Sequence, residues 1–265
     1  MALTEEPKIS DPRLLIDYLK SAGPAETINW EGLLARQYRR LLDSPRVIVD
    51  VGAHAGAHTS HFLNIGARKV VCFEPLPHLA EALKAKFADQ PVEVHAVALN
   101  HEEGESEFVF NMTTPSESGL KQRVFSLAEE QRLQRITVQM RRLDSFALQD
   151  VDFIKTDCEG AELNVLSGGR DVVRRDRPFV SVEYGADGYA AYGLQQDALL
   201  IWAVENGYRV SDLFGNSLND RGDYEYCVDK YYWDFLLIPE EKWQESSRRL
   251  HDGAREIIGN IRNLP

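Results

Sequence analysis

Cysteine is scarce in this sequence, and so are the long apolar runs that membrane spans and secretion signals require. The three cysteines, Cys72, Cys158 and Cys227, are odd in number and far apart. This pattern suits reduced thiols in a cytoplasm and excludes a disulfide framework. No apolar run approaches the roughly 20 residues of a membrane span, and Met1 to Ser10 lacks the apolar core of a signal peptide. We therefore expect a cytoplasmic protein without a transmembrane segment.

Basic residues are in the minority as well. Lys and Arg number 30 against 42 Asp and Glu, which gives a net charge of −12. Nucleic acids and anionic membranes are bound through a basic surface, so we expect neither as a partner. With 265 residues, of which 43% are hydrophobic, the chain can bury a full core and is the size of one large domain with additions.

The stretch from Arg46 to Leu76 predicts a strand, a glycine turn, a helix and a second strand. Apolar runs at 47–51 and 70–73 are typical of buried strands, and a helix over 59–65 would end at Gly66. Such units form parallel sheets, whose ligands bind beyond the carboxyl ends of the strands.

The turn after the first strand reads D-V-G-A-H-A-G, not the G-x-G-x-x-G of dinucleotide-binding turns. Asp50 would lie where a diphosphate binds in such turns. The negative charges of its carboxylate and of the diphosphate would repel each other there. A ligand with an amino group and a sulfonium fits better. Glu74, at the end of the second strand, would then accept hydrogen bonds from a ribose diol.

Further apolar runs complete the predicted sheet. They lie at 92–99, 151–155, 179–183, 208–213 and 235–238. Helices are expected at 12–22, 30–43, 78–88, after 162, at 195–206 and at 240–261. The prediction is therefore an α/β fold with a seven-stranded, mostly parallel sheet, antiparallel at its end and covered by helices on both faces.

Three additions to this sheet are expected. Alternating residues at 105–112 and 136–142 predict an inserted antiparallel hairpin, and the polar link at 113–119 predicts a mobile loop over the site. We expect an N-terminal helical extension over 1–44, the main domain over 45–239, and a C-terminal helix over 240–265 packed on it. Trp243, Leu250 and Ile257 of that helix are seven apart, which would suit a homodimer seam.

The motifs DVGAHAGAHT, CFEP, GESEFVF with ITVQMRRLDSF, and DFIKTDCEGAELNVLSGG resemble the FkbM family of S-adenosylmethionine-dependent O-methyltransferases. The resemblance covers about residues 45–185 and extends loosely to 240. It implies a class I Rossmann-like methyltransferase domain that acts on hydroxyl groups of sugars, glycolipids or natural-product intermediates, so the expected partner is a small-molecule or carbohydrate acceptor. His54 departs from the family pattern, where many relatives carry Asn, and the terminal helices match no family motif. The expected S-adenosylmethionine contacts are Asp50, Gly52, His54, Gly56, Glu74, Pro75, Leu99 and Asp157.

Methyl transfer to a hydroxyl requires in-line alignment and a group that accepts the hydroxyl proton. Asp157 and Glu159 leave the fourth strand and Glu183 leaves the fifth, so three acids would converge on one rim. Such acids should raise one another's pKa, which would suit a base near neutral pH. His58, in the first turn of the helix after the glycine turn, is an alternative base.

Each candidate also has a structural interpretation. Asp157 could cap the following helix, Glu183 could pair with a basic residue, and His58 could lie on a helix surface. Glu162 suits the helix dipole in a first helical turn. No local set of zinc ligands is present, but the oxygens of Asp157, Glu159 and Glu183 could hold Mg²⁺ and orient a diol.

Two other functions share this sheet. An NAD-dependent oxidoreductase would also use Glu74, but the turn lacks its third glycine and carries Asp50. A non-catalytic nucleoside-binding partner module would bind the cofactor without forming product, because the fold alone does not define function.

Overall fold

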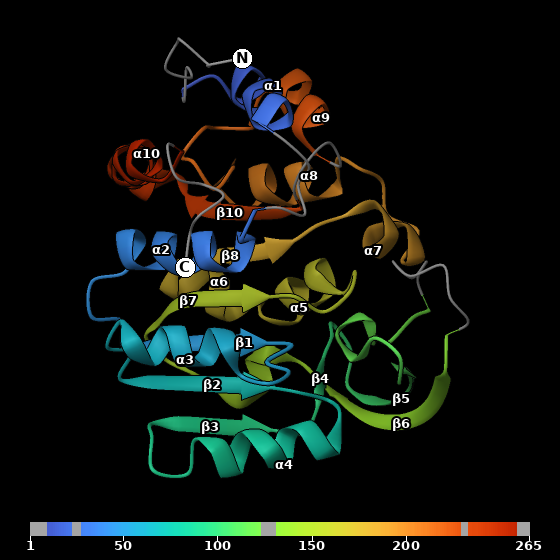
Figure 1. The fold of residues 1–265 in the computed structure, drawn as a ribbon. Helices are drawn as coiled ribbons and strands as arrows, with labels where there is room; N and C mark the ends of the chain where they lie inside the picture. The colour runs from blue at the N-terminus through green and yellow to red at the C-terminus, as the bar shows by residue number, and fades with distance from the viewer. Residues whose placement is uncertain (1–9, 23–27, 123–130, 229–232, 259–265) are drawn as a thin grey trace. The chain divides into compact units, whose positions relative to one another are not determined.

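The computed structural model describes residues 10–22, 28–122, 131–228 and 233–258 (Figure 1). The chain divides into two compact units, one formed by residues 44–195 and the other by residues 1–43 with 196–265. The predicted three-part division at residues 44 and 239 stays a prediction.

The 44–195 unit contains five parallel strands in the order β3-β2-β1-β7-β8. These strands are β1 (Val47–Val51), β2 (Lys69–Phe73), β3 (Val92–His95), β7 (Val151–Thr156) and β8 (Phe179–Glu183). β-branched and aromatic side chains fill their centres, and Ile48, Val70 and Phe153 are completely buried. Because the strands are parallel, their carboxyl ends lie on one edge, where Figure 1 shows the arrowheads pointing the same way.

Helices connect these strands and cover them. The helices are α3 (Ala57–Asn64), α4 (Pro77–Lys86), α5 (Glu162–Gly168), α6 (Arg170–Asp176) and α7 (Ala186–Ala191), with short 3-10 turns η2 (Pro115–Glu117) and η3 (Leu143–Phe146). The helix α3 contacts β1 and β2, while α4 contacts β3. Gly66 follows α3 with a φ of 84°, as the helix stop at that glycine predicts.

A second sheet of three strands lies beside the carboxyl ends of the parallel strands (Figure 1). It consists of β4 (Ala98–Leu99), β5 (Gly104–Asn111) and β6 (Leu133–Arg141). The predicted antiparallel pairing of β5 with β6 is confirmed. The prediction of one strand over 92–99 is wrong: the parallel strand ends at His95, and β4 pairs with Met140 and Arg141 of β6 instead.

The polar link after β5 has more structure than the sequence suggested. Residues 115–117 form η2, and Gly119 makes a β-bridge with Val109, with backbone hydrogen bonds of 2.9 and 3.1 Å in the two directions. The first part of the link is therefore tied to the hairpin. Residues 123–130 lie outside the described residues.

The other unit contains α1 (Pro12–Ala22), α2 (Trp30–Leu41), α8 (Ala198–Glu205), β9 (Tyr208–Ser211), α9 (Arg221–Cys227), β10 (Asp234–Pro239), η4 (Glu240–Lys242) and α10 (Trp243–Ile258). The strands β9 and β10 are antiparallel, as predicted. The predicted α/β class, with a mostly parallel seven-stranded sheet, is confirmed. The sequence did not predict α9, which Asp220 caps by accepting a hydrogen bond from the Asp223 N–H.

The helix α10 packs against α2 and β10 within this unit. Trp243 and Leu250 are 7% and 0% exposed, so they are buried in their own chain and are not a free seam. The side chain of Ile257 lies outside the described residues. A homodimer through this helix stays a prediction that these two side chains do not support. Among the described residues, no helix is long and apolar enough to cross a membrane.

Candidate active site

The bend between β1 and α3 is the predicted cofactor turn. Gly52, His54 and Gly56 have φ of 77°, 45° and 74°, in the left-handed region. A Cβ on Gly52 would lie 1.9 Å from the carbonyl oxygen of Asp157, and one on Gly56 would lie 2.6 Å from Cε2 of Phe87. Both positions therefore require glycine because of neighbours in the protein itself, whatever ligand the bend binds.

The carboxylate of Asp50 is completely buried under α3. Its Oδ2 accepts a hydrogen bond of 2.6 Å from Thr59 Oγ1, whereas Oδ1 has no partner among the described residues. Burial raises the pKa of Asp50, and the charge of Lys155 and the Thr59 hydrogen bond offset part of that rise. A buried carboxylate oxygen without a partner suits a ligand that brings a donor or a positive charge.

Glu74 connects the end of β2 to the bend. Its Oε2 accepts the His54 N–H and its Oε1 accepts the Leu76 N–H, each at 2.9 Å. Burial raises the pKa of Glu74, and these two hydrogen bonds lower it in part. Each carboxylate oxygen has a second lone pair, so a ribose hydroxyl can still bind there.

Pro75 and Leu99 complete the predicted cofactor set. Pro75 is half-buried directly after Glu74. Leu99 is buried in β4, so the prediction that it ends the third parallel strand is wrong. Its contact with a cofactor stays a prediction.

The D-C-E-G corner after β7 touches the cofactor bend directly. The Asp157 N–H donates to the Val51 carbonyl at 3.2 Å, and the corner continues with positive φ at Glu159 (60°) and Gly160 (101°). A Cβ on Gly160 would lie 2.3 Å from the carbonyl oxygen of Gly188, which explains this glycine. The left-handed Glu159 is a strained position of the kind found at functional sites.

Glu162 holds this corner together. Its Oε1 accepts hydrogen bonds from the N–H groups of Cys158 at 2.9 Å and Gly160 at 3.1 Å, and the residue is 1% exposed. These contacts favour the structural interpretation of Glu162 in the first turn of α5. Burial raises its pKa to about 6.

We therefore expect Glu162 to make the protein less stable as the pH rises. Its ordinary pKa is 4.5, so between that value and about 6 the folded state holds a proton that the unfolded state has lost. The stabilising contribution is complete below pH 4.5 and disappears above pH 6, a change of about 2 kcal/mol. Glu162→Gln keeps an acceptor oxygen but does not titrate. Urea unfolding at several pH values should show that the free energy of unfolding of the wild type falls by this amount, relative to that of the variant, as the pH rises through this range. A difference that is constant with pH would contradict the assignment.

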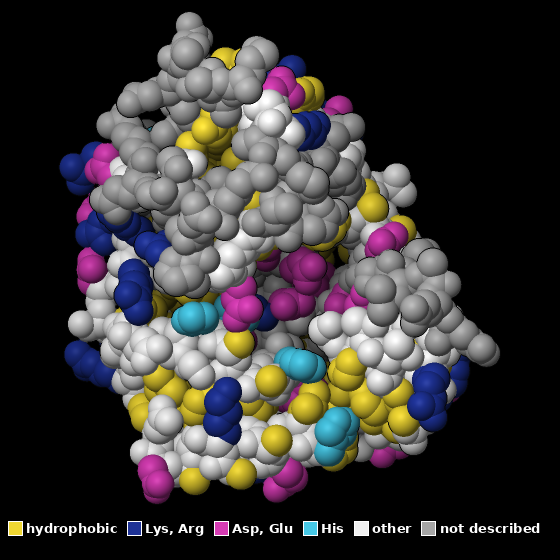
Figure 2. Space-filling view, in the orientation of Figure 1, with side chains coloured by type: hydrophobic (Ala, Val, Ile, Leu, Met, Phe, Trp, Pro, Cys, Tyr) yellow, Lys and Arg dark blue, Asp and Glu magenta, His cyan; other side chains and the backbone are white. Residues whose placement is uncertain are grey.

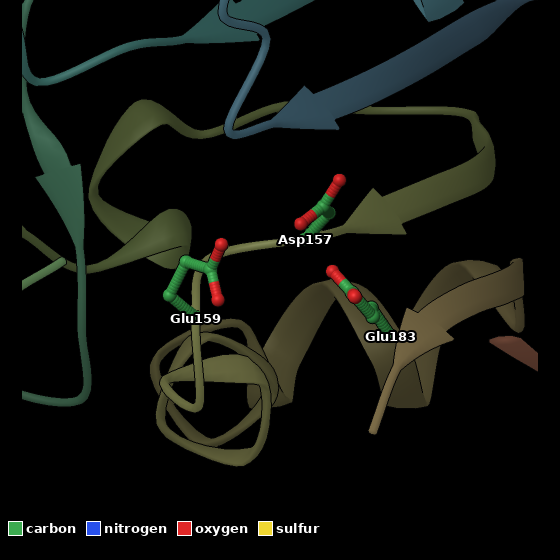
Figure 3. Close-up of side chains that lie close together, drawn as sticks. All are labelled: Asp157, Glu159 and Glu183. Atoms are coloured by element: carbon green, nitrogen blue, oxygen red, sulfur yellow. The ribbon is translucent and has the colours of Figure 1, made fainter. Parts of the chain in front are cut away.

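The three predicted acids come together. Oxygens of Asp157, Glu159 and Glu183 lie within 4.8 Å of one another, and Figure 3 shows the carboxyl groups directed toward each other. Glu159 is 8% exposed, and the other two are half-buried. Asp and Glu side chains also gather in the middle of the face that Figure 2 draws. The predicted convergence of the acids at the strand ends is confirmed, while their catalytic roles stay predictions.

The expectation that the acids raise one another's pKa is wrong for Asp157. Burial raises the pKa of Asp157, but the charge of Lys155 and hydrogen bonds with Glu183 and Lys155 outweigh it and hold the pKa below its ordinary value. The hydrogen bond with Glu183 therefore acts in the same direction as the charge of Lys155 and favours the ionised form of Asp157.

Lys155 is the residue that sequence reasoning missed. It is 4% exposed near the carboxyl end of β7, and its Nζ lies 3.0 Å from Asp157 Oδ2. The available signal was a lysine inside the apolar run DFIKT, where a charge is rarely buried without a partner.

His58 lies half-buried in the first turn of α3. Burial and the charge of Lys155 lower its pKa to about 3, although the charge of Asp157 opposes this. The imidazole is therefore neutral at neutral pH and is a weak proton acceptor. Its role as an alternative base stays a prediction.

The chain is similar to several known methyltransferases. The 2-O-methyltransferase NoeI of Sinorhizobium fredii is 28% identical over 170 residues, which are 56% of this chain and 68% of NoeI. A solved FkbM methyltransferase from Methylobacillus flagellatus KT is similar with a TM-score of 0.48 and 15% identity over 74% of this chain. This chain covers only 44% of that protein. An O-methyltransferase from Bacillus cereus, solved with SAH, has a TM-score of 0.42 and 14% identity over 89% of this chain and 92% of its own.

The family comparison covers both halves of the site. Residues 50–210 match the family described as the methyltransferase FkbM domain, a range that begins at Asp50 and includes the D-C-E-G corner and Glu183. The chain belongs to the FkbM family of S-adenosylmethionine-dependent methyltransferases.

Proposed function

We propose that this protein transfers a methyl group from S-adenosylmethionine to a hydroxyl oxygen of a sugar or a similar small polyhydroxyl acceptor. The observation that carries the proposal is the contact between the glycine bend and the acid-bearing corner. The Asp157 N–H bonds to Val51, so the acids begin where the bend begins. A cofactor in the bend would present its methyl group next to the acids.

On the cofactor side, Asp50 and Glu74 supply the polar contacts. The unpartnered Oδ1 of Asp50 suits the positive charge of the methionine part, and Glu74 suits the ribose. Gly52, His54, Gly56 and Pro75 would shape the bend around the cofactor, with Asp157 closing it. When bound, the cofactor supplies an electrophilic methyl group on a sulfonium, which leaves as a neutral sulfide.

On the acceptor side, Glu159 is the best base. Asp157 is held by Lys155, which lowers its pKa, and Glu183 is hydrogen-bonded to Asp157, so both are already engaged within the cluster. As the acceptor oxygen bonds to the methyl carbon and the carbon–sulfur bond breaks, the hydroxyl proton would pass to Glu159. Asp157 and Glu183 would orient the acceptor. Alignment of the reacting groups lowers the free-energy barrier by about 7 to 11 kcal/mol in well-aligned reactions.

The acceptor class follows from the charge of the rim and from the relative. NoeI is named as a 2-O-methyltransferase, which supports a hydroxyl acceptor here too. The three acids within 4.8 Å outnumber the one lysine beside them, so they would repel an acceptor with a phosphate or carboxylate close to its reacting hydroxyl. A neutral sugar or glycoside fits this rim best.

A label-transfer experiment tests this function. The protein is incubated with S-adenosylmethionine labelled in its methyl group and with neutral methyl hexopyranosides, beside the same sugars carrying a carboxylate or a phosphate. We expect label on the neutral sugars. Binding of S-adenosylhomocysteine without transfer to any sugar or cell extract would instead support the non-catalytic module. The NAD-dependent oxidoreductase is not favoured by the family match.

We expect turnover to survive removal of divalent metal. The acid oxygens are close enough to share an ion, but Lys155 already occupies Asp157 Oδ2 and Glu183 is hydrogen-bonded to Asp157. The cluster therefore fits Mg²⁺ poorly. Dialysis against EDTA followed by the label-transfer assay checks this. Activity that disappears and returns with Mg²⁺ would restore the magnesium prediction.

A cytoplasmic location stays a prediction.

A further inference from the structure

A row of polar side chains crosses the parallel sheet under α3. Asp50 is in register with Cys72 of β2 on one side and with Lys155 of β7 on the other, and Lys155 is in register with Ser181 of β8. Neighbouring residues in register point to the same face of a sheet. All four are at most 4% exposed, so this is a buried polar row in a sheet whose other central residues are apolar.

Lys155 connects this row to the acid cluster. Its backbone lies beside Asp50, whereas its Nζ reaches Asp157 Oδ2 at 3.0 Å, two residues further along the chain. A buried ammonium group loses several kcal/mol of hydration, which only well-placed anions can offset. Lys155 therefore lies between two anions, with Asp50 beside it on β1 and Asp157 directly after the end of β7.

We propose that Lys155 is a positioning residue for methyl transfer. By holding one oxygen of Asp157, it fixes the Asp157–Glu183 pair, so that the acceptor hydroxyl is presented to Glu159 in line with the methyl group. This inference rests on the proposed function. Lys155 touches neither substrate in this scheme and acts through Asp157.

The expected effect of removing the ammonium group is on turnover. Lys155→Met should lower kcat by about 10- to 100-fold, because a displacement of about 1 Å at a reacting group can cost that much. The dissociation constant of the Lys155→Met variant for S-adenosylhomocysteine should change by a smaller factor than its kcat. Lys69→Met is the matched control: Lys69 also lies on a parallel strand and pairs with Glu93 at 2.6 Å, but it begins β2 at the opposite edge of the sheet and is 43% exposed. It should have wild-type kcat.

A double-mutant cycle with Asp157→Asn decides the proposal. The kcat of wild type, Lys155→Met, Asp157→Asn and the double variant is measured with the methyl hexopyranoside that the wild type labels. Active sites are counted by S-adenosylhomocysteine titration, so that misfolded molecules do not contribute. If Lys155 acts through Asp157, adding Lys155→Met to Asp157→Asn should change kcat by less than about threefold, because residues that act as a unit are not additive.

The outcomes separate this inference from the function on which it rests. An equal loss of kcat from Lys155→Met in both backgrounds would overturn the positioning role and leave the methyltransferase proposal intact. If Lys155→Met alone does not fold, the comparison of Asp157→Asn with the neutral double variant makes the same decision. A wild type that labels no acceptor would remove both proposals.

Discussion

Replacing Gly52 with alanine should cost more than about 4 kcal/mol of unfolding free energy or prevent folding, beyond the usual range for a point mutation. The residue has a φ of 77°, and its added Cβ would lie 1.9 Å from the carbonyl oxygen of Asp157. Neither group can move freely, because the Asp157 N–H bonds to Val51 and the Gly52 N–H bonds to Phe73. Urea unfolding, with circular dichroism as the signal, measures the loss.

Gly66→Ala separates backbone strain from this overlap. Gly66 has a similar φ of 84°, but an added Cβ would meet no atom within 4 Å. Alanine there should cost only the left-handed conformation, about 1 to 2 kcal/mol. Equal losses for the two variants would show that the contact between bend and corner is looser than the structure indicates.

The sequence was sufficient to predict the elements whose pattern is local. The apolar runs of β1, β2, β7 and β8 and the glycine at the end of α3 are readable because burial on both faces and a left-handed stop leave direct traces in the sequence. The convergence of Asp157 and Glu183 was also predictable, since parallel neighbours end at one edge.

Features that depend on distant partners were not predictable in the same way. The strand β4 exists because Ala98 and Leu99 find Met140 and Arg141 in the inserted hairpin, about 40 residues later in the chain. The short helix α9 depends on the burial of Tyr224 and Cys227 as well as on the Asp220 cap. Neither the pairing of β4 with β6 nor the packing of α9 leaves a periodic pattern in the sequence.

The glycines show how a motif can have two causes. Gly52 and Gly56 were predicted to contact the cofactor, yet an added Cβ at these positions would overlap Asp157 and Phe87 of the same protein. The glycine bend and the acid-bearing corner can lie this close at Gly52 only because this residue lacks a side chain. The requirement for glycine and the location of the acids therefore have one physical origin.

The placement of charges around the acids also depends on residues that are apart in the fold pattern. Three acids alone predict mutual repulsion and raised pKa values. Lys155 reverses this for Asp157, and the shared hydrogen bond with Glu183 does so further. This charge arrangement supports the proposal that Glu159, at its strained backbone position, is the acid that accepts the proton.

Glu159→Gln should reduce turnover by about 10²- to 10⁴-fold, the usual contribution of a general base. Glutamine keeps the size of the side chain and tolerates the φ of 60° as glutamate does, but it does not accept a proton. The dissociation constant for S-adenosylhomocysteine should stay within about threefold of wild type, because Glu159 is assigned to the acceptor and a lost uniform contact would raise only KM. Label transfer at saturating cofactor and acceptor measures kcat, and calorimetry measures the affinity.

Glu81→Gln is the matched control for this prediction, since Glu81 lies on α4, pairs with Lys84 at 2.8 Å and has a side chain that is 70% exposed. It should retain full kcat. If Glu159→Gln also retained full kcat, the proton would have to leave through Asp157 or His58, and the role assigned to the corner would be wrong. If affinity for S-adenosylhomocysteine fell in parallel with kcat, Glu159 would instead belong to the cofactor side of the site.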